Sequence, residues 1–251
     1  LGGDLFSPSA VGTASYQGDR LAGRQMVDVM NHFGLNYATF GNHEFDIKEN
    51  QFKQRLQEAK FTWISSNVLN ADGRSLSNVH QNLIIPFTDK KSGKSFKIGI
   101  FGLTLTTNKP DYISYTDPLT TAGNQVRQLA KTADPTTALT HQTIHDDIQL
   151  LQAYPQIALL LGGHEHTNFQ NWRGNFTPLL KADANVRSVY VIDIYYHLQN
   201  RKTEIKPTFV PINDTLTEDT TVKAVVDQWM KIAFDAFREQ GFQPEQVVAI
   251  T

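Results

Sequence analysis

The chain has 251 residues, and its 23 Lys and Arg against 25 Asp and Glu give a formal net charge of -2 at pH 7. Because a basic excess is the footprint of a nucleic-acid binder, we expect no nucleic-acid partner. The chain has no cysteine, which excludes disulfides and thiolate metal sites and leaves His, Asp, Glu, Asn and Gln as possible metal ligands. No apolar run approaches the length of a membrane span, so we expect a soluble protein, either periplasmic or secreted or cytoplasmic.

Apolar spacing predicts strands that alternate with helices in the first part of the chain. Residues 1–4 read as the end of a strand, and we expect further residues upstream of them. The elements that follow are a helix over 18–33, strands over 36–40 and 62–68 with a helix over 47–60 between them, and strands over 84–87 and 96–103. The turn at 90–93 joins the last two strands as an antiparallel hairpin, so the sheet is expected to be mixed.

The second part of the chain begins with the same alternation and then changes. It reads as a helix over 124–132, a strand over 136–140, a helix over 144–153, a strand over 157–161, antiparallel strands over 178–181, 188–196 and 203–211, a long helix over 218–239 and a strand over 247–251. This order favours an α/β fold built as a two-sheet sandwich with helices on its outer faces.

One stretch, Gly41-Asn42-His43-Glu44-Phe45-Asp46, combines an amide, an imidazole and two carboxylates in a loop between a predicted strand and a predicted helix. In open α/β sheets, ligands and reacting groups gather outside the carboxyl ends of the strands. The alternative is that Asn42 and Asp46 only cap the helix that follows. Taken alone, the stretch does not decide between these interpretations.

Similar residues end three other predicted strands and favour a functional site. Asp4 follows the first strand end, His141 follows the strand over 136–140, and His164-Glu165-His166 follows two glycines after the strand over 157–161. Imidazoles with a carboxylate and an amide oxygen suit Zn, Mn, Fe or Co better than Ca or Mg. If 164–166 is extended, His164 and His166 face the same side and can contact neighbouring metals.

These motifs resemble those of the calcineurin-like metallophosphoesterases, and most closely the 5'-nucleotidase branch of that family. The resemblance is carried by Gly3-Asp4, Gly41 to Asp46, Thr140-His141 and Gly162-Gly163-His164-Glu165-His166. It implies a metallophosphoesterase-type αββα sandwich with mixed sheets, and a catalytic domain over residues 1–211. Residues 212–251 would then be a linker helix and the start of a C-terminal substrate-binding domain.

The resemblance also implies roles for single residues and a substrate class. Asp4 would bridge two divalent transition metals, with Asn42, His141 and His164 completing one site and His166 contributing to the other. His43 would be the catalytic histidine, and Asp46 would orient it. The substrate would be a small phosphate ester of the nucleotide class, hydrolysed by water that the metals activate.

The sequence departs from the family pattern at one point. The family has an Asp-x-His on its first strand, which supplies two ligands of the second metal, and no such motif precedes Asp4 in this chain. We therefore expect this chain to bind at most one metal tightly, unless Glu165 or Asp147 replaces the missing pair. The alternative function is a catalytically disabled fragment, or a binding module with the same fold.

Overall fold

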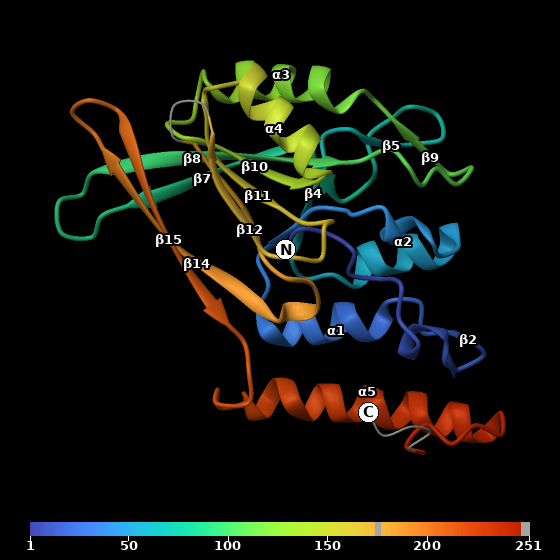
Figure 1. Ribbon diagram of the computed structural model, residues 1–251. Coiled ribbons are helices and arrows are strands. Elements are labelled where there is room, and N and C mark those ends of the chain that lie inside the picture. The colour runs from blue at the N-terminus through green and yellow to red at the C-terminus, as the bar shows by residue number, and fades with distance from the viewer. Residues whose placement is uncertain (174–176, 247–251) are drawn as a thin grey trace.

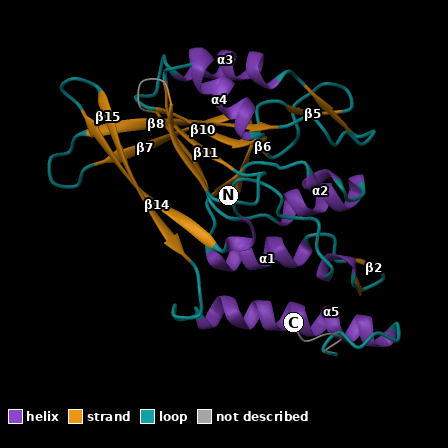
Figure 2. Cartoon of the chain, viewed as in Figure 1, coloured by secondary structure: helices purple, strands orange, loops and turns teal. Residues whose placement is uncertain are grey.

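The computed structural model describes residues 1–173 and 177–246, and it shows strands at the centre of the molecule with helices above and below them (Figures 1 and 2). The expected α/β class, with mixed sheets flanked by helices, is confirmed. The predicted strand over 247–251 lies outside the described residues. The division into domains at residue 211 stays a prediction.

The larger sheet has six strands in the order β12-β13-β11-β10-β8-β7. They are β7 (Asn82–Thr88), β8 (Ser95–Thr104), β10 (Thr136–His141), β11 (Ile157–Gly162), β12 (Phe169–Arg173) and β13 (Thr177–Lys181). The four central strands are parallel, whereas β7 and β12 run antiparallel to their neighbours. Since parallel strands end at one edge of a sheet, β10, β11 and β13 deliver His141, Gly162 and Lys181 to the same place.

Two helices cover one face of this sheet, α3 (Pro118–Leu129) and α4 (Ile144–Ala153), which lie above it in Figure 1. Leu103, Ala138 and Leu160 from the sheet pack with Leu129 and Leu150 from the helices in one buried cluster. Each fully buried leucine contributes roughly 1.5–3 kcal/mol through removal of apolar surface from water. This packing makes the central strands a rigid base for the loops at their ends.

The smaller sheet contains three short parallel strands, β3 (Tyr37–Ala38), β4 (Thr62–Ile64) and β6 (Val79–His80). Leu1 lies beside β3, because its amino group donates to the Tyr37 carbonyl (2.9 Å) and its carbonyl accepts from the Thr39 N–H (3.1 Å). The first residues therefore run along the sheet as the sequence predicts, although they are not assigned as a strand.

An aromatic core joins the smaller sheet to helices α1 (Arg24–Phe33) and α2 (Glu49–Glu58). Phe40 and Trp63 stack with ring centroids 4.7 Å apart, and Phe6 and Phe52 pack edge-on or tilted against them. Such pairs add about 0.5–1.5 kcal/mol each to the burial of their surface. The residues before and after Asp4 and Asn42 are thus anchored in one hydrophobic cluster.

The two sheets are joined by hydrogen bonds between β8 and the segment after β4. The Ser66 N–H donates to the Gly102 carbonyl (2.8 Å), and the buried Asn67 side chain both donates to and accepts from the Thr104 backbone (2.7 and 2.9 Å). The Thr104 hydroxyl in turn donates to the Phe40 carbonyl (2.8 Å), next to Gly41. This seam fixes the loop of residues 41–46 relative to the larger sheet.

A long antiparallel ribbon, β14 (Ser188–His197) and β15 (Lys202–Pro211), crosses the end of the larger sheet (Figure 1). Ile192, Ile194 and Ile205 of the ribbon pack on Leu159 and Leu180 of the sheet. Two further pairs are small, β1 (Ser15–Tyr16) with β2 (Asp19–Arg20) and β5 (Val68–Asn70) with β9 (Ile113–Tyr115).

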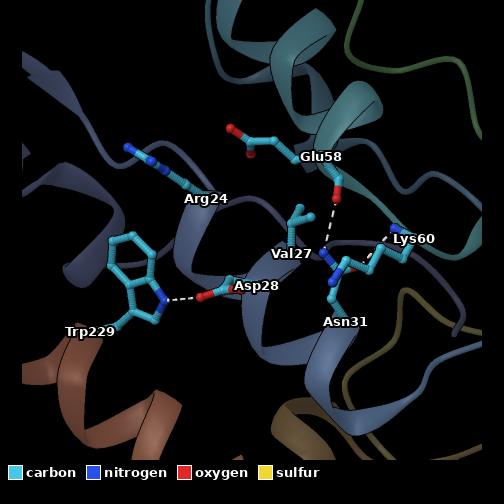
Figure 3. A pocket seen from close by; sticks show the side chains of 7 residues that line it. All are labelled: Arg24, Val27, Asp28, Asn31, Glu58, Lys60 and Trp229. Atoms are coloured by element: carbon cyan, nitrogen blue, oxygen red, sulfur yellow. Dashed lines mark hydrogen bonds between the residues drawn. The ribbon is translucent and has the colours of Figure 1, made fainter.

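The last helix, α5 (Thr220–Glu239), lies against α1, on the opposite side of the molecule from α3 (Figure 1). The Trp229 indole N–H donates to Asp28 on α1 (2.8 Å), and both residues line a pocket of about 310 Å³ between the helices (Figure 3). None of the residues that the sequence predicts for the site lines this pocket. No helix in the described ranges is long and apolar enough to cross a membrane.

Several predicted boundaries are wrong for identifiable reasons. The helix expected over 18–33 begins only at Arg24, because Gly23 precedes it in the left-handed conformation (φ 84°) and the residues before form the β1–β2 pair. Helix α3 begins at Pro118, six residues before the expected start, with Asp117 as its N-cap. The expected strand over 62–68 is divided between β4 and β5.

The end of the larger sheet also differs from the prediction. Strand β12 was not expected, because Gln170, Asn171 and Arg173 leave no apolar alternation to detect. The strand over 178–181 was expected to be antiparallel, but β13 pairs parallel with β11 and antiparallel with β12.

The seam between the sheets predicts a cost for a side chain at Gly102. A Cβ at this position would lie 2.1 Å from the Ile64 carbonyl oxygen. Gly102→Ala should therefore lower the free energy of unfolding by about 1–3 kcal/mol, the usual cost of overpacking, as measured by urea unfolding. Gly12→Ala is the matched control, since its Cβ would meet no atom closer than 3.6 Å. Equal unfolding midpoints for the two variants would show that the sheets do not approach closely at β8.

Candidate functional site

Asp4 is at the centre of the candidate site. It follows Gly3 in a loop where both residues have positive φ (56° for Asp4 and 90° for Gly3). Its Oδ1 accepts a hydrogen bond from the His43 backbone N–H (3.0 Å), and its Oδ2 lies 3.2 Å from His141 Nε2. The loop thus brings the end of the first segment, the 41–46 stretch and the end of β10 together.

His141 is buried, and the ring nitrogen that faces away from Asp4 is held by a hydrogen bond. Its Nδ1 donates to the Gly2 carbonyl (2.6 Å), which leaves Nε2 facing Asp4. Burial raises the pKa of Asp4, but His141 and then His43 together lower it by more, so the pKa of Asp4 is lowered. Burial likewise lowers the pKa of His141, but Asp4, the Gly2 carbonyl and Glu44 together raise it by more, so the pKa of His141 is raised. A metal cation between Asp4 and His141 would have to take the place of the proton on His141 Nε2, because only the neutral imidazole binds a metal.

Glycines from three loops allow the close approach around His141 and Asp4. A Cβ on Gly41 would lie 2.1 Å from Asp4 Oδ1, and one on Gly3 would lie 2.6 Å from His141 Nδ1. A Cβ on Gly163 would lie 2.2 Å from the Gly2 carbonyl oxygen. These positions accept only glycine unless the backbone moves.

Glu44 holds the Asp4 loop in place, a role that the sequence did not reveal. Its carboxyl group is fully buried and accepts hydrogen bonds from the backbone N–H groups of Asp4 (2.9 Å), Leu5, Phe6 (3.1 Å) and Gly41. Burial, and then the charge of Asp4, raise its pKa, whereas the backbone donors lower it. Glu44 is therefore a structural member of the motif and points beneath the site.

Asn42 does not cap helix α2, whose N-cap is Lys48, so that alternative is wrong for this residue. It precedes the short 3-10 helix at His43–Phe45, but its side chain makes no capping hydrogen bond. Its side-chain oxygen is buried and has no hydrogen-bond partner among the described residues. A buried amide oxygen is costly to leave without a partner, and a cation would provide one.

His43 and Asp46 form the expected pair. His43 Nδ1 lies 2.7 Å from Asp46 Oδ2, and both side chains are about one third exposed (36% and 32%). Asp46 does not cap helix α2, whose N-cap is Lys48. Asn108 was not predicted, yet its amide donates to Asp46 Oδ1 (2.8 Å) and to the Asn42 carbonyl (2.9 Å). Asn108 could have been found from its place in the loop after β8, at the same edge of the sheet as the other site residues.

His164 lies beside His141, with ring centroids 5.2 Å apart. Burial, and then the charge of His141, lower the pKa of His164. The segment is not extended as the sequence predicted, because His164 and His166 both have positive φ (86° and 59°). His166 is exposed, and its carbonyl accepts from the Ala184 N–H (3.3 Å).

Glu165 and Asp147 do not point toward Asp4 as substitute ligands. Both carboxylates pair with the buried Lys181 ammonium, at 2.5 Å for Glu165 Oε2 and 2.9 Å for Asp147 Oδ2. Burial raises the pKa of Asp147 to about 6, although the nearby Lys181 lowers it.

The residues present fit one cation in part. Within residues 1–173 and 177–246, no three His, Cys, Asp or Glu side chains gather closely enough to hold a metal ion. Two ligands of one transition metal, each about 2.0–2.2 Å from it, lie about 3.0–3.5 Å apart, which matches the 3.2 Å between Asp4 Oδ2 and His141 Nε2. Asn42 adds a buried amide oxygen without a partner in those ranges, and His164 lies beside His141.

Comparisons with known proteins identify a family and several relatives of this chain. The family model described as calcineurin-like phosphoesterase matches residues 1–168. The snake venom 5'-nucleotidase of Gloydius brevicauda is 28% identical over 247 residues, which covers 87% of this chain and 41% of that protein. The trifunctional nucleotide phosphoesterase protein YfkN of Bacillus subtilis (strain 168) is 25% identical over 279 residues, 95% of this chain and 18% of that protein. This chain thus spans less than half of the length of either relative.

Solved structures show the same fold at low sequence identity. The structure of the calcineurin-like phosphoesterase YfkN from Bacillus subtilis superposes with a TM-score of 0.77 and 18% identity, covering 94% of this chain and 84% of that chain. The 5'-nucleotidase precursor from Thermus thermophilus gives a TM-score of 0.69 and 19% identity, covering 90% of this chain and 48% of that chain. The family match spans two thirds of the sequence and includes Asp4, the 41–46 stretch, His141 and His164 to His166; the chain belongs to the calcineurin-like phosphoesterase family.

Proposed function

We propose that this protein is a metal-dependent phosphohydrolase of the 5'-nucleotidase type, which hydrolyses a nucleotide or a related phosphate ester. One observation carries the proposal: the His43 backbone donates to Asp4 Oδ1 while Asp4 Oδ2 faces His141. The residue proposed for proton transfer is thereby held next to the pair proposed to hold a cation, which supports metal-assisted phosphoryl transfer.

The cation-binding residues would be those that end the strands. Asp4, Asn42, His141 and His164 would hold one divalent transition metal, Mn, Zn, Fe or Co, and Asp4 with His166 would contribute to a second. Bound divalent cations supply Lewis-acid polarisation of the phosphoryl oxygens and a more acidic water for attack at phosphorus. The buried Asn42 side-chain oxygen and the Asp4–His141 pair support this assignment.

His43 would assist the transfer by donating a hydrogen bond or proton to a phosphoryl oxygen or to the leaving oxygen. Asp46 accepts from Nδ1, so Nε2 is the nitrogen that remains for the substrate. Asn108 holds the other oxygen of Asp46 and thereby limits rotation of the pair. The partial exposure of His43 leaves it accessible to a small substrate.

The substrate class rests on the relatives. The curated relatives are named as a 5'-nucleotidase and a nucleotide phosphoesterase, which supports a nucleotide or a related ester for this chain. We also propose that residues 212–251, with helix α5, link the catalytic domain to a substrate-binding domain. The identity of the substrate would depend largely on that domain.

A binding module with the same fold is the second candidate. It is favoured by one observation, that three acidic or imidazole side chains do not gather into a ready metal cluster within the described ranges. The two candidates differ in turnover, because a module would bind a nucleotide or a metal without releasing phosphate.

The role of His43 predicts a loss of rate without a loss of metal. His43→Ala should lower kcat for a nucleoside monophosphate by about 10²–10⁴-fold, the usual contribution of a positioned acid or base, while bound metal stays unchanged. Phosphate release and metal analysis of the same samples would measure both quantities.

His32→Ala is the matched control for that variant. His32 is also a partly exposed histidine beside an aspartate, with Nδ1 3.3 Å from Asp28 Oδ1, but it lies on α1 away from the site. Its loss should leave kcat unchanged. If His43→Ala lost its metal, or kept full turnover, the assigned role would be wrong.

The ligand inventory predicts metal stoichiometry for residues 1–251. One proposed site has Asp4, Asn42, His141 and His164, whereas the other has only Asp4 and His166, and a two-ligand site binds weakly. Dialysis against Mn²⁺ or Zn²⁺ should therefore leave one tightly held equivalent, with phosphate release well below that of a protein that holds two.

Two substitutions check that the retained ion is in this site. Asp4→Asn should abolish tight binding, because it removes the only carboxylate in the proposed ligand set. Asp214→Asn, at an exposed loop position, should leave binding unchanged. Two tightly held equivalents with full activity would show that the ligand set given above is incomplete.

A further inference from the structure

Lys181 is a fully buried lysine at the end of β13, with 1% of its surface exposed. Its ammonium group contacts four oxygens: the carbonyls of Gln142 (2.6 Å) and Gly163 (2.9 Å), and the carboxylates of Asp147 (2.9 Å) and Glu165 (2.5 Å). A buried ammonium is costly unless it is paired and hydrogen-bonded, and here both conditions are met.

The partners of Lys181 belong to the two loops that carry proposed metal ligands. Gln142 follows His141 directly, and Gly163 precedes His164 directly. One ammonium group therefore ties the residue after one imidazole to the residue before the other. These two imidazoles are the pair whose rings lie 5.2 Å apart.

Glu165 is fully engaged on the side away from the site. One of its oxygens pairs with Lys181, and the other accepts from the backbone N–H of Ile144, the first residue of α4. The side chain between the two histidines of the loop is therefore anchored to the N-terminus of a helix, where a carboxylate is favoured. The loop turns on both sides of this anchor, since His164 and His166 have positive φ.

The glycine before Gly163 makes room for the lysine. A Cβ on Gly162 would lie 2.7 Å from Lys181 Cε and 3.2 Å from Asp147 Oδ2. The two glycines thus serve different purposes, since Gly163 allows the approach to Gly2 and His141. The Gly-Gly pair and Lys181 form one arrangement, although they come from different strands.

We propose that Lys181 is a positioning residue for the metal centre: its ammonium group fixes the loops of His141 and His164 relative to each other and holds Glu165 and Asp147 away from the metal. The inference rests on the metal centre of the proposed function. In this proposal, the buried ammonium group of Lys181 determines the geometry of the neighbouring site, which would bind a metal ion. Residues that orient ligands in this way typically change metal affinity by about 10–100-fold.

The absence of cysteine from the chain permits a sharp test. Lys181→Cys introduces a single thiol, which can be alkylated in denaturant before refolding. Alkylation with 2-bromoethylamine rebuilds a lysine-like side chain with its ammonium group, and alkylation with 1-bromopropane gives an uncharged side chain of nearly the same shape. Unaltered protein is unfolded and refolded in parallel, and Mn²⁺ affinity is measured by equilibrium dialysis.

A second variant separates positioning from simple charge balance. Lys181→Met leaves the buried Asp147 carboxylate and the partly exposed Glu165 carboxylate without their cation and should be destabilised, whereas Lys181→Met with Asp147→Asn removes the buried charge. The double variant should recover much of the thermal stability that the single variant loses. Its Mn²⁺ affinity should stay reduced about 10–100-fold, because no ammonium group joins the two loops.

The expected result is Mn²⁺ binding by the aminoethylated protein close to that of the unaltered one, with binding by the propylated protein and the double variant at least about tenfold weaker. Equal affinity of the propylated and aminoethylated proteins, or unaltered affinity in the double variant, would overturn the role of Lys181. If the unaltered protein itself bound no Mn²⁺, the proposed metal centre would be wrong, and this inference would be wrong with it.

Discussion

The site depends first on the buried carboxyl group of Glu44. Its two oxygens accept four backbone N–H groups, three from residues 4–6 and one from Gly41. A carboxyl group in such a place has a pKa raised by burial, so the donors are needed to offset the cost of removing it from water. Because these donors belong to two separate segments, Glu44 sets the distance between Asp4 and the Asn42-His43 pair. The Asp4 contacts with His43 and His141 follow from that distance.

The sequence predicted which side chains lie together in the candidate site better than it predicted the residues that hold them in place. Asp4, Asn42, His43, Asp46, His141 and His164 each follow an apolar strand or a glycine turn, and such positions carry a readable pattern because strand ends share an edge of the sheet. The helices over 47–60 and 144–153 were also predictable, since their apolar spacing is helical. The resemblance to the family implies roles for these residues that spacing alone could not suggest.

The supports could not be predicted because each depends on a contact between distant segments. Glu44 and Asp46 are both carboxylates of the 41–46 stretch, and the local sequence does not distinguish their roles. Only the tertiary fold directs Glu44 to the backbone of the Asp4 loop and Asp46 to His43. Asn108 lies in a loop with no periodicity, and Lys181 ends a strand whose parallel pairing with β11 the sequence does not indicate. His164 and His166 have positive φ on either side of the anchored Glu165, and the alternation of residues reveals neither feature.

Buried ionisable groups thus support His141 from two directions. On one side, Glu44 holds the loop of Gly41 and Asp4; on the other, Lys181 holds the loops that follow β10 and β11. Neither the Glu44 carboxyl group nor the Lys181 ammonium group is directed at the space between Asp4 and His141. Protein atoms alone therefore provide their hydrogen-bond partners, with or without a cation in that space. The loops are then held in place before any ligand binds, and less ordering entropy remains to be lost on binding. The buried ionisable groups and the glycines therefore have complementary roles. The glycines permit the close approach of the loops, and the buried groups restrict the backbone freedom that glycine would otherwise leave.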